Sequence, residues 1–111
     1  MIFKSVHPRL AIPQTNLVDY LFPADQEPSN EPLWIDSADP SHFLSEAEVV
    51  QWSKSLSKGL GDAGLRQGEV VMLFTPNHIF VPVAYLGIVG GGYRYSAGNP
   101  AFTLRGKYLA E

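Results

Sequence analysis

The stretch from Val70 to Tyr93 contains no Asp, Glu, Lys or Arg, and it constrains the fold of this chain more than any other feature. A membrane-spanning helix needs about 20 mainly apolar residues in a row. Here the run is interrupted by Thr75-Pro76-Asn77-His78, and a second proline follows at Pro82. Because proline and asparagine mark turns, the stretch favours two short buried elements over a membrane span. A membrane-associated peptide is the weaker alternative.

The two elements of this stretch both predict extensive burial. Val70-Val71-Met72-Leu73-Phe74 is apolar without alternation, which is typical of a strand covered on both faces, as in a parallel sheet. The segment from Ile79 to Val89 predicts a helix that is apolar on all sides, with Pro82 tolerated in its first turn. A chain of this size has too few other elements to cover both. We therefore expect either a fragment or a protein partner, or self-association, covering residues 70–74 and 79–89.

A third element, and the clearest helix, begins at Ser45, because Ser45-Glu46-Ala47-Glu48 fits a capping box. In this motif the Ser45 hydroxyl accepts a hydrogen bond from the Glu48 amide, and the Glu48 carboxylate reaches back to Ser45. Gly64 is suited to end the helix in the left-handed conformation. Apolar residues at spacings of three and four predict the buried face, and they are Val49, Trp52, Leu56, Leu60 and Ala63.

The whole chain divides into an irregular front and an α/β body. Residues 1–31 are rich in proline and contain a predicted short helix at 16–22, with Asn16 as its N-cap. Residues 32–111 form a partial α/β domain, because helix, strand, helix and strand follow one another and favour parallel pairing. Its other predicted elements are a strand at 33–36, a strand at 93–96 after Gly90-Gly91-Gly92, and a helix at 104–111.

Composition limits the partners of the chain. A net charge of −3 gives no basic surface, so we expect no nucleic acid partner. Cysteine is absent, which excludes disulfides and thiolate metal sites. The first residues lack the apolar segment of a secretory signal, and the last ones do not form a peroxisomal signal. We expect an intracellular, cytoplasmic protein.

Two glycine-rich segments resemble nucleotide-binding motifs in their letters but lack the surrounding elements that such motifs require. Gly59 to Gly64 matches G-x-G-x-x-G, but that fingerprint must follow a strand and open a helix, whereas here it closes one. Gly87 to Gly92 lacks the Gly-Lys-Ser/Thr of a phosphate loop. We interpret the first segment as a helix end and the second as a sharp turn with close helix–strand packing.

Other candidate side chains have simpler structural explanations. The histidines are isolated from one another, although His78, at a predicted helix start, is the one placed to line a cleft at a strand's carboxyl end. Ser96 lacks the G-x-S-x-G context of a hydrolase nucleophile. The remaining candidates are His7 and His42 without a metal cluster, Asp36, Asp39, Glu46 and Glu48 at turns and helix starts, and Trp34 and Trp52 in the core.

Four segments form a colinear series between Pro32 and Thr103. They are Phe43-Leu44-Ser45-Glu46-Ala47-Glu48-Val49, the run from Gly64 to Phe74, Thr75-Pro76-Asn77-His78 with Pro82 to Ile88, and Gly90-Gly91-Gly92 with Asn99-Pro100-Ala101-Phe102-Thr103. In this order they resemble the opening motifs of adenylate-forming acid–CoA ligases. The most similar group is the 4-coumarate–CoA ligase-like one, which includes acyl-CoA ligases of fungal secondary metabolism.

The resemblance implies an incomplete N-terminal part of that family's large α/β domain. Family members use ATP and Mg²⁺ to turn a carboxylic acid into an acyl-adenylate, and they then transfer the acyl group to coenzyme A. The family's phosphate loop, ribose-binding Asp and catalytic Lys lie beyond the matching segment. The resemblance therefore carries no catalytic, cofactor-binding or metal-binding residue onto this sequence, and no cofactor is expected for the fragment itself.

The tail departs from the family pattern at Leu104-Arg105-Gly106-Lys107-Tyr108. Gly106 in the predicted helix costs about 1 kcal/mol relative to alanine. We expect a truncated, ligase-like protein that is inactive alone. The alternative is a non-catalytic interaction module that docks through exposed apolar surfaces.

Overall fold

In the computed structural model of the protein, which describes residues 2–101, three helices and four strands alternate along the chain. They are α1 (Leu17–Leu21), β1 (Pro32–Ile35), β2 (Phe43–Ser45), α2 (Glu46–Asp62), β3 (Val70–Phe74), α3 (Val81–Gly90) and β4 (Arg94–Gly98). Within the described part, no helix combines the length and apolar character that crossing a membrane requires. The helix predicted at 104–111 lies outside the described residues.

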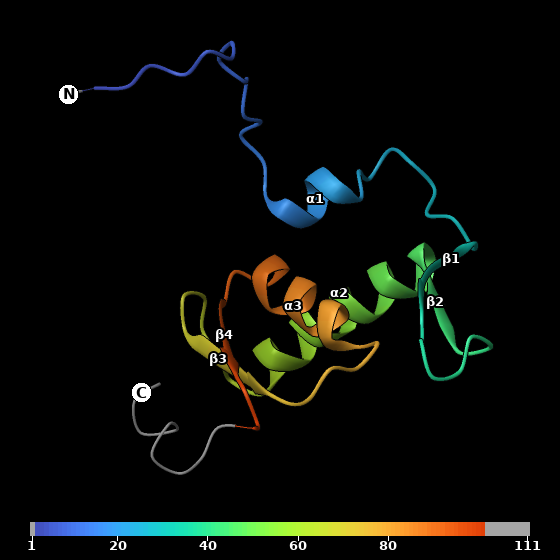
Figure 1. Cartoon of the computed structure of the whole chain (residues 1–111). Helices are drawn as coiled ribbons and strands as arrows, with labels where there is room; N and C mark the ends of the chain where they lie inside the picture. Colours follow the sequence, from blue (N-terminus) through green and yellow to red (C-terminus); the bar gives the residue numbers. More distant parts are fainter. Residues whose placement is uncertain (1, 102–111) are drawn as a thin grey trace.

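The strands β3 and β4 pair directly and in parallel, and the helix α3 connects them along the chain. This confirms the predicted α/β arrangement. Their register pairs Val70 with Arg94 and Phe74 with Gly98. Helices α2 and α3 pack against each other on one side of this pair (Figure 1). The short helix α1, capped by Asn16 as predicted, packs on α3 from the other side.

A hairpin of β1 and β2 contacts the N-terminal end of α2. The pairing is antiparallel, with Trp34 opposite Leu44 and Ile35 opposite Phe43. The strand β1 was expected, whereas β2 was not, because its three residues run directly into the α2 cap and are too short for a recognisable alternation. The hairpin places Leu44 in the main core.

The core lies where the hairpin, α2 and α3 meet. Its buried members are Leu44, Val49, Val83 and Leu86, and Val18, Phe22, Trp34, Ile79 and Phe80 pack around them. Val49 and Ile88 are the largest fully buried side chains of the described part. Burying a side chain of this kind contributes about 1.5–3 kcal/mol. Helix packing and the hairpin therefore share one apolar centre, and Trp34 contributes to it as predicted.

The ends of α2 are as predicted. The Ser45 amide donates to the Glu48 carboxylate at 2.8 Å, and the Glu48 amide donates back to the Ser45 hydroxyl at 3.3 Å. These two bonds complete the capping box. At the other end Gly64 has φ of +96°, the left-handed conformation that glycine adopts without strain.

The buried face of α2 differs from the prediction. Trp52 is 51% exposed and contacts Phe80 edge-to-face at 6.0 Å, and Ala63 is also exposed. Ser53 is buried instead, at 3% exposure, and faces α3. The error has a physical cause: an apolar-periodicity argument omits serine, although small residues allow two helix backbones to approach closely.

The strand β3 is covered on one face and not on both. Val71 and Leu73 are half-buried toward the helices, whereas Val70, Met72 and Phe74 are 62%, 51% and 48% exposed. The prediction of two covered faces is therefore wrong for residues 2–101. The shortage of covering elements, which the sequence also indicated, is the reason.

The helix α3 begins two residues later than predicted. Ile79 and Phe80 form a turn before it, and Pro82 occupies its first turn. Val83, Leu86 and Ile88 are buried, and Tyr85 leans on Tyr95 of β4, with ring centroids 5.0 Å apart. An apolar helix is thus covered by α2, α1 and the hairpin together.

Candidate functional site

A cavity of about 560 Å³ lies at the edge of the sheet where β3 and β4 both end. The carboxyl ends of parallel strands meet at one edge, and open α/β sheets bind ligands there. Thr75, Pro76 and Asn77 line it after β3, and Asn99, Pro100 and Ala101 line it after β4. Leu73, Val81, Tyr95, Ala97 and Gly98 form the rest of its wall.

Local sequence explains why both strands stop at this edge. Proline lacks the N–H that a continuing strand would use, and Pro76 and Pro100 each follow a strand end closely. The Asn99 side chain accepts a hydrogen bond from the Ala101 amide at 2.9 Å and so closes a turn. At Gly98, a β-carbon would lie 2.7 Å from the Phe74 ring, so a larger residue would require that ring to shift.

Among residues 2–101, the side chains that line the cavity include none that is charged at neutral pH. Its polar groups are the Thr75 hydroxyl, the Asn77 and Asn99 amides and the Tyr95 phenol. Val81 lies at the N-terminus of α3, but one helix end of about half a charge does not balance a triphosphate. Over residues 2–101, no group of three or more His, Asp or Glu side chains is placed to hold a metal ion. The part of the wall formed by residues 2–101 fits an uncharged group better than ATP with Mg²⁺.

His78 lies beside this cavity, at a smaller one of about 210 Å³ that it lines with Phe80 and Ala84. Its Nδ1 atom accepts a hydrogen bond from the Phe80 amide at 3.2 Å, and its ring stacks on the Phe80 ring at 5.8 Å. The sequence placed His78 at a helix start beside a cleft, and the structure has it in the turn before α3, at this smaller cavity. The side chain is exposed and has no acidic neighbour in the two cavity walls.

Comparison with known proteins identifies the architecture around this cavity. A 4-coumarate–CoA ligase of Narcissus pseudonarcissus is 36% identical over 103 residues, which are 92% of this chain and 19% of the relative. An acyl-CoA ligase of Aspergillus niger is 29% identical over 92 residues, 83% of this chain and 17% of the relative. Apo MatB of Rhodopseudomonas palustris superposes with a TM-score of 0.71 at 28% identity, covering 85% of this chain and 18% of that one. These matches support an acid–CoA ligase fragment.

The ligase relationship covers most of this chain but little of its relatives. The chain spans less than a fifth of the length of the curated ligases it matches. No family model matches the chain. MatB has also been solved with ATP bound, and that structure superposes with a TM-score of 0.64 over the same 18% of its length. The matching region is therefore one α/β unit of a much larger ligase.

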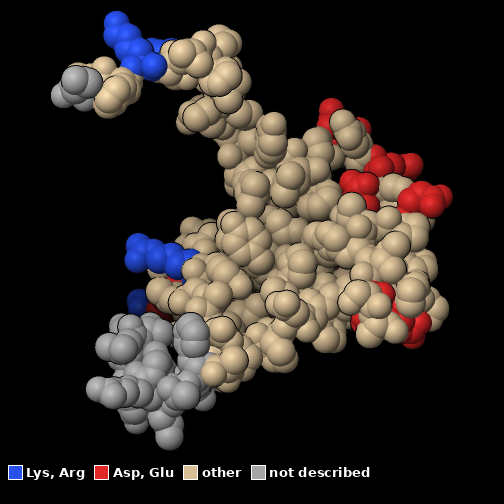
Figure 2. Space-filling model, in the orientation of Figure 1, with Lys and Arg blue, Asp and Glu red and all other residues tan. Residues whose placement is uncertain are grey.

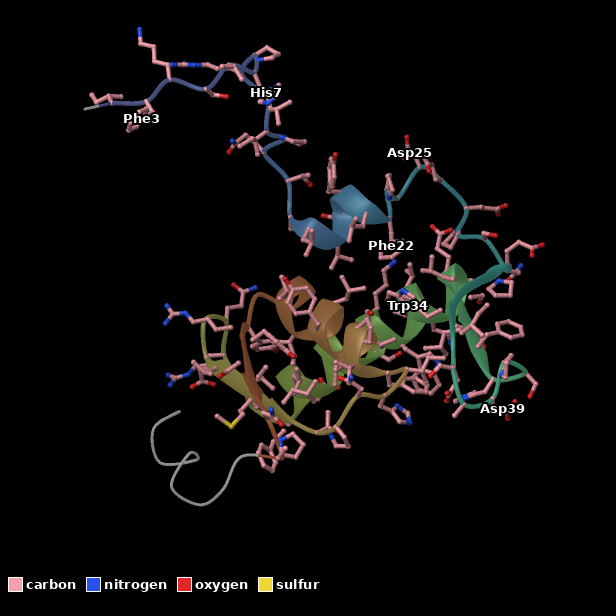
Figure 3. All side chains as sticks on the ribbon, viewed as in Figure 1. Phe3, His7, Phe22, Asp25, Trp34 and Asp39 are labelled. Carbon is pink, nitrogen blue, oxygen red and sulfur yellow. The ribbon has the colours of Figure 1, made fainter. Side chains whose placement is uncertain are left out.

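The other histidines and carboxylates of this ligase segment stay apart from the cavity. His42 and Asp36 approach to 3.4 Å in the hairpin turn. The Ala38 amide, and then His42, lower the pKa of Asp36, and the hydroxyl and amide of Ser41 lower that of Asp39. These carboxylates therefore support turns, as predicted. His7 lies on the N-terminal segment, far from the hairpin turn that carries Asp39 (Figure 3).

Near the start of α2, the carboxylates serve the helix and its neighbours. The Ser45 amide, followed by its hydroxyl, lowers the pKa of Glu48. Glu46 accepts a hydrogen bond from the Ser29 amide at 3.2 Å. The Ser29 carbonyl in turn accepts from Ala47 at 3.0 Å, so the loop before β1 is tied to the helix start. A structural role accounts for both carboxylates.

The glycine segments of the ligase unit have the packing roles that the sequence suggested. The segment from Gly59 to Gly64 ends α2 and leads into the turn before β3. Gly87 lies under α2, where a β-carbon would meet the Ser53 carbonyl and the Leu56 side chain at 2.9 Å. Gly92 has φ of +79° in the turn after α3. None of these backbones lines the cavity wall.

Two groups of residues escaped the sequence reasoning about sites. Asn77 and Asn99 entered it only as parts of family motifs, although each follows a predicted strand next to a proline. Ser53 and Ser57 were not considered, yet their hydroxyls donate to the Val83 and Gly87 carbonyls of α3. Serines four residues apart on an otherwise apolar helix face, together with a glycine in the partner helix, were the available signal.

Proposed function

We propose that this chain is the opening α/β unit of an ATP-dependent acid–CoA ligase and that it serves that enzyme as a framework. The observation that supports the proposal is the match over 92% of the chain to a ligase of which it is only 19%. The family reaction joins a carboxylic acid to coenzyme A through an acyl-adenylate. In the complete enzyme, ATP, Mg²⁺ and coenzyme A bind elsewhere, and this unit holds one cavity at the edge of its parallel strands.

The chain alone is then expected to be inactive. Adenylation needs donors around the α-phosphate and a cation to balance developing charge. The uncharged wall around Asn77 and Asn99 offers neither. Purified chain incubated with ATP, Mg²⁺, coenzyme A and a panel of aryl and fatty acids should form no acyl-adenylate and no thioester. Turnover above that of a heat-treated sample would contradict the proposal.

A chimera tests the framework role directly. The segment of the Narcissus ligase that matches this chain is replaced by this chain, and thioester formation from 4-coumarate is measured. We expect a soluble chimera whose kcat/KM falls by no more than about tenfold, which is about 1.4 kcal/mol. The control chimera carries Gly87→Leu, which blocks the contact with Ser53 and should abolish soluble expression. A soluble, folded and inactive first chimera would refute the framework role.

A second candidate function, a non-catalytic interaction module, is favoured by one observation. The outer face of β3 leaves Val70, Met72 and Phe74 about half exposed, and adjoining apolar side chains of this kind are typical of interfaces. Sedimentation of the purified chain separates the candidates. A discrete oligomer held together through the outer face of β3 supports the module, whereas an aggregating chain supports a ligase piece that lacks its surroundings. For the first candidate, the ligase framework, we also propose an intracellular location and a role in secondary metabolism.

A further inference from the structure

The N-terminal segment of residues 2–12, here called the arm, leaves large apolar side chains uncovered. Ile2, Val6 and Leu10 are 93%, 93% and 87% exposed, and the arm contains no helix or strand. It carries Lys4 and Arg9 and no acidic residue, so it is both apolar and basic. In Figure 1 it extends from the start of α1 away from the body. An apolar arm in this position needs a surface to cover it.

The hairpin offers a surface of the opposite charge. Eight of the eleven acidic residues lie between residues 19 and 48, and no Lys or Arg occurs from residue 10 to residue 53. Figure 2 shows the acidic side chains gathered on the side of the molecule that faces away from the basic arm. Figure 3 shows the same separation, with Phe3 and His7 on the arm and Asp39 at the tip of the hairpin.

The hairpin also has an apolar face that nothing in the described part covers. Leu33, Ile35 and Phe43 are 44%, 58% and 40% exposed. Ile35 and Phe43 are paired in register and share one face, while Trp34 and Leu44 point into the core from the other. We call Leu33, Ile35 and Phe43 the outer hairpin face. It combines exposed apolar side chains with an acidic surrounding.

Charge distinguishes the outer hairpin face from the exposed outer face of β3. The outer face of β3 shares its side of the sheet with Arg94, which pairs in register with Val70. A basic arm would meet a like charge there, and like charges disfavour an interface. At the hairpin, Glu27 and Glu31 precede β1 and are exposed. Charge complementarity therefore assigns the arm to the hairpin and not to β3.

We propose that the arm of one copy of this chain docks on the outer hairpin face of a second copy. The second copy is favoured over the same copy because the arm leaves α1 on the side opposite to its own hairpin. Two copies related by a two-fold axis exchange arms reciprocally, which closes the assembly at a dimer. Lys4 and Arg9 then lie among the acidic residues, and the apolar arm residues cover Ile35 and Phe43.

Sedimentation of the full chain over a range of concentrations tests the proposal. We expect a monomer–dimer equilibrium that weakens as salt is raised from about 0.05 M to about 0.5 M, because salt screens exposed charges. Reversing the arm with Lys4→Glu and Arg9→Glu should weaken the dimer by at least about tenfold. Reversing the face with Glu27→Lys and Glu31→Lys should have the same effect. Mixing the two reversed variants should restore a mixed dimer.

A matched pair of strand substitutions separates the two apolar faces. Ile35→Thr on the hairpin and Val70→Thr on β3 both replace an exposed β-branched residue by a polar one. Only Ile35→Thr should weaken the dimer. The proposal is overturned by a chain that is monomeric at all concentrations, by larger aggregates, or by a dimer that survives arm reversal or deletion of residues 2–12. It is equally overturned if Val70→Thr weakens the dimer as much as Ile35→Thr.

Discussion

The contact between α2 and α3 depends on the missing side chain of Gly87. A β-carbon there would lie 2.9 Å from the Ser53 carbonyl oxygen and 2.9 Å from the Leu56 Cδ2 atom. The leucine methyl can rotate away, but the carbonyl belongs to the α2 backbone and cannot. Gly87→Ala therefore forces the two helices apart. The separation also weakens the bond from the Ser57 hydroxyl to the Gly87 carbonyl.

Two opposing effects set the magnitude for Gly87→Ala. Alanine in a helix interior is about 1 kcal/mol more favourable than glycine. Overpacking costs about 1–3 kcal/mol, and a clash with backbone belongs to the upper part of that range. We expect the free energy of unfolding to fall by about 1–2 kcal/mol. In a domain of this size, each 1 kcal/mol lowers the melting temperature by about 4–8 °C.

Gly59→Ala is the matched control, since it also lies in a helix but a β-carbon there meets nothing within 4 Å. It should raise the free energy of unfolding by about 0.5–1 kcal/mol. Urea unfolding followed by the fluorescence of Trp34 and Trp52 measures both variants. If Gly87→Ala were as stable as the parent chain while Gly59→Ala was stabilised, the close-contact reasoning would be refuted.

Two further predictions concern the start of α2 and the acidic turns. Ser45→Ala removes the N-cap and should lower the free energy of unfolding by about 1 kcal/mol in urea, whereas Ser55→Ala on the exposed side of α2 should not lower it. Asp36, Asp39 and Glu48 have folded-state pKa values below their ordinary 3.8 and 4.5, so their contribution is complete above the ordinary values and is lost as pH falls through the folded ones. The urea midpoint should therefore be constant from about pH 7 to about pH 5 and drop below about pH 4; a midpoint unchanged down to about pH 3 would contradict this assignment.

Features that depend on a few neighbouring residues were predicted well. The capping box at Ser45, the left-handed Gly64 and the cap at Asn16 each involve atoms within one helical turn. The order of α2, β3, α3 and β4 also followed from local patterns, because parallel pairing requires a crossover element and the chain has one. The cavity edge was anticipated through His78, which borders it.

Features that depend on distant residues were predicted poorly. The α2 face was assigned to Trp52, but the facing helix presents Gly87 and carbonyl oxygens that accept hydrogen bonds from the Ser53 and Ser57 hydroxyls. No periodicity within α2 contains that information. The candidate cavity likewise joins Asn77 and Asn99, which are 22 positions apart in the sequence and meet only because β3 and β4 end at one edge.

The sequence by itself determined the caps of α1 and α2, the parallel α/β order and the ligase relationship, because caps, turns and colinear motifs are local signals. The tertiary structure decided which faces these elements bury. Burial depends on the shape and charge of whatever lies opposite, and residues 2–101 leave Val70, Met72 and Phe74 about half exposed. An apolar run indicates that a strand is buried. Only the tertiary structure shows which face of that strand is buried.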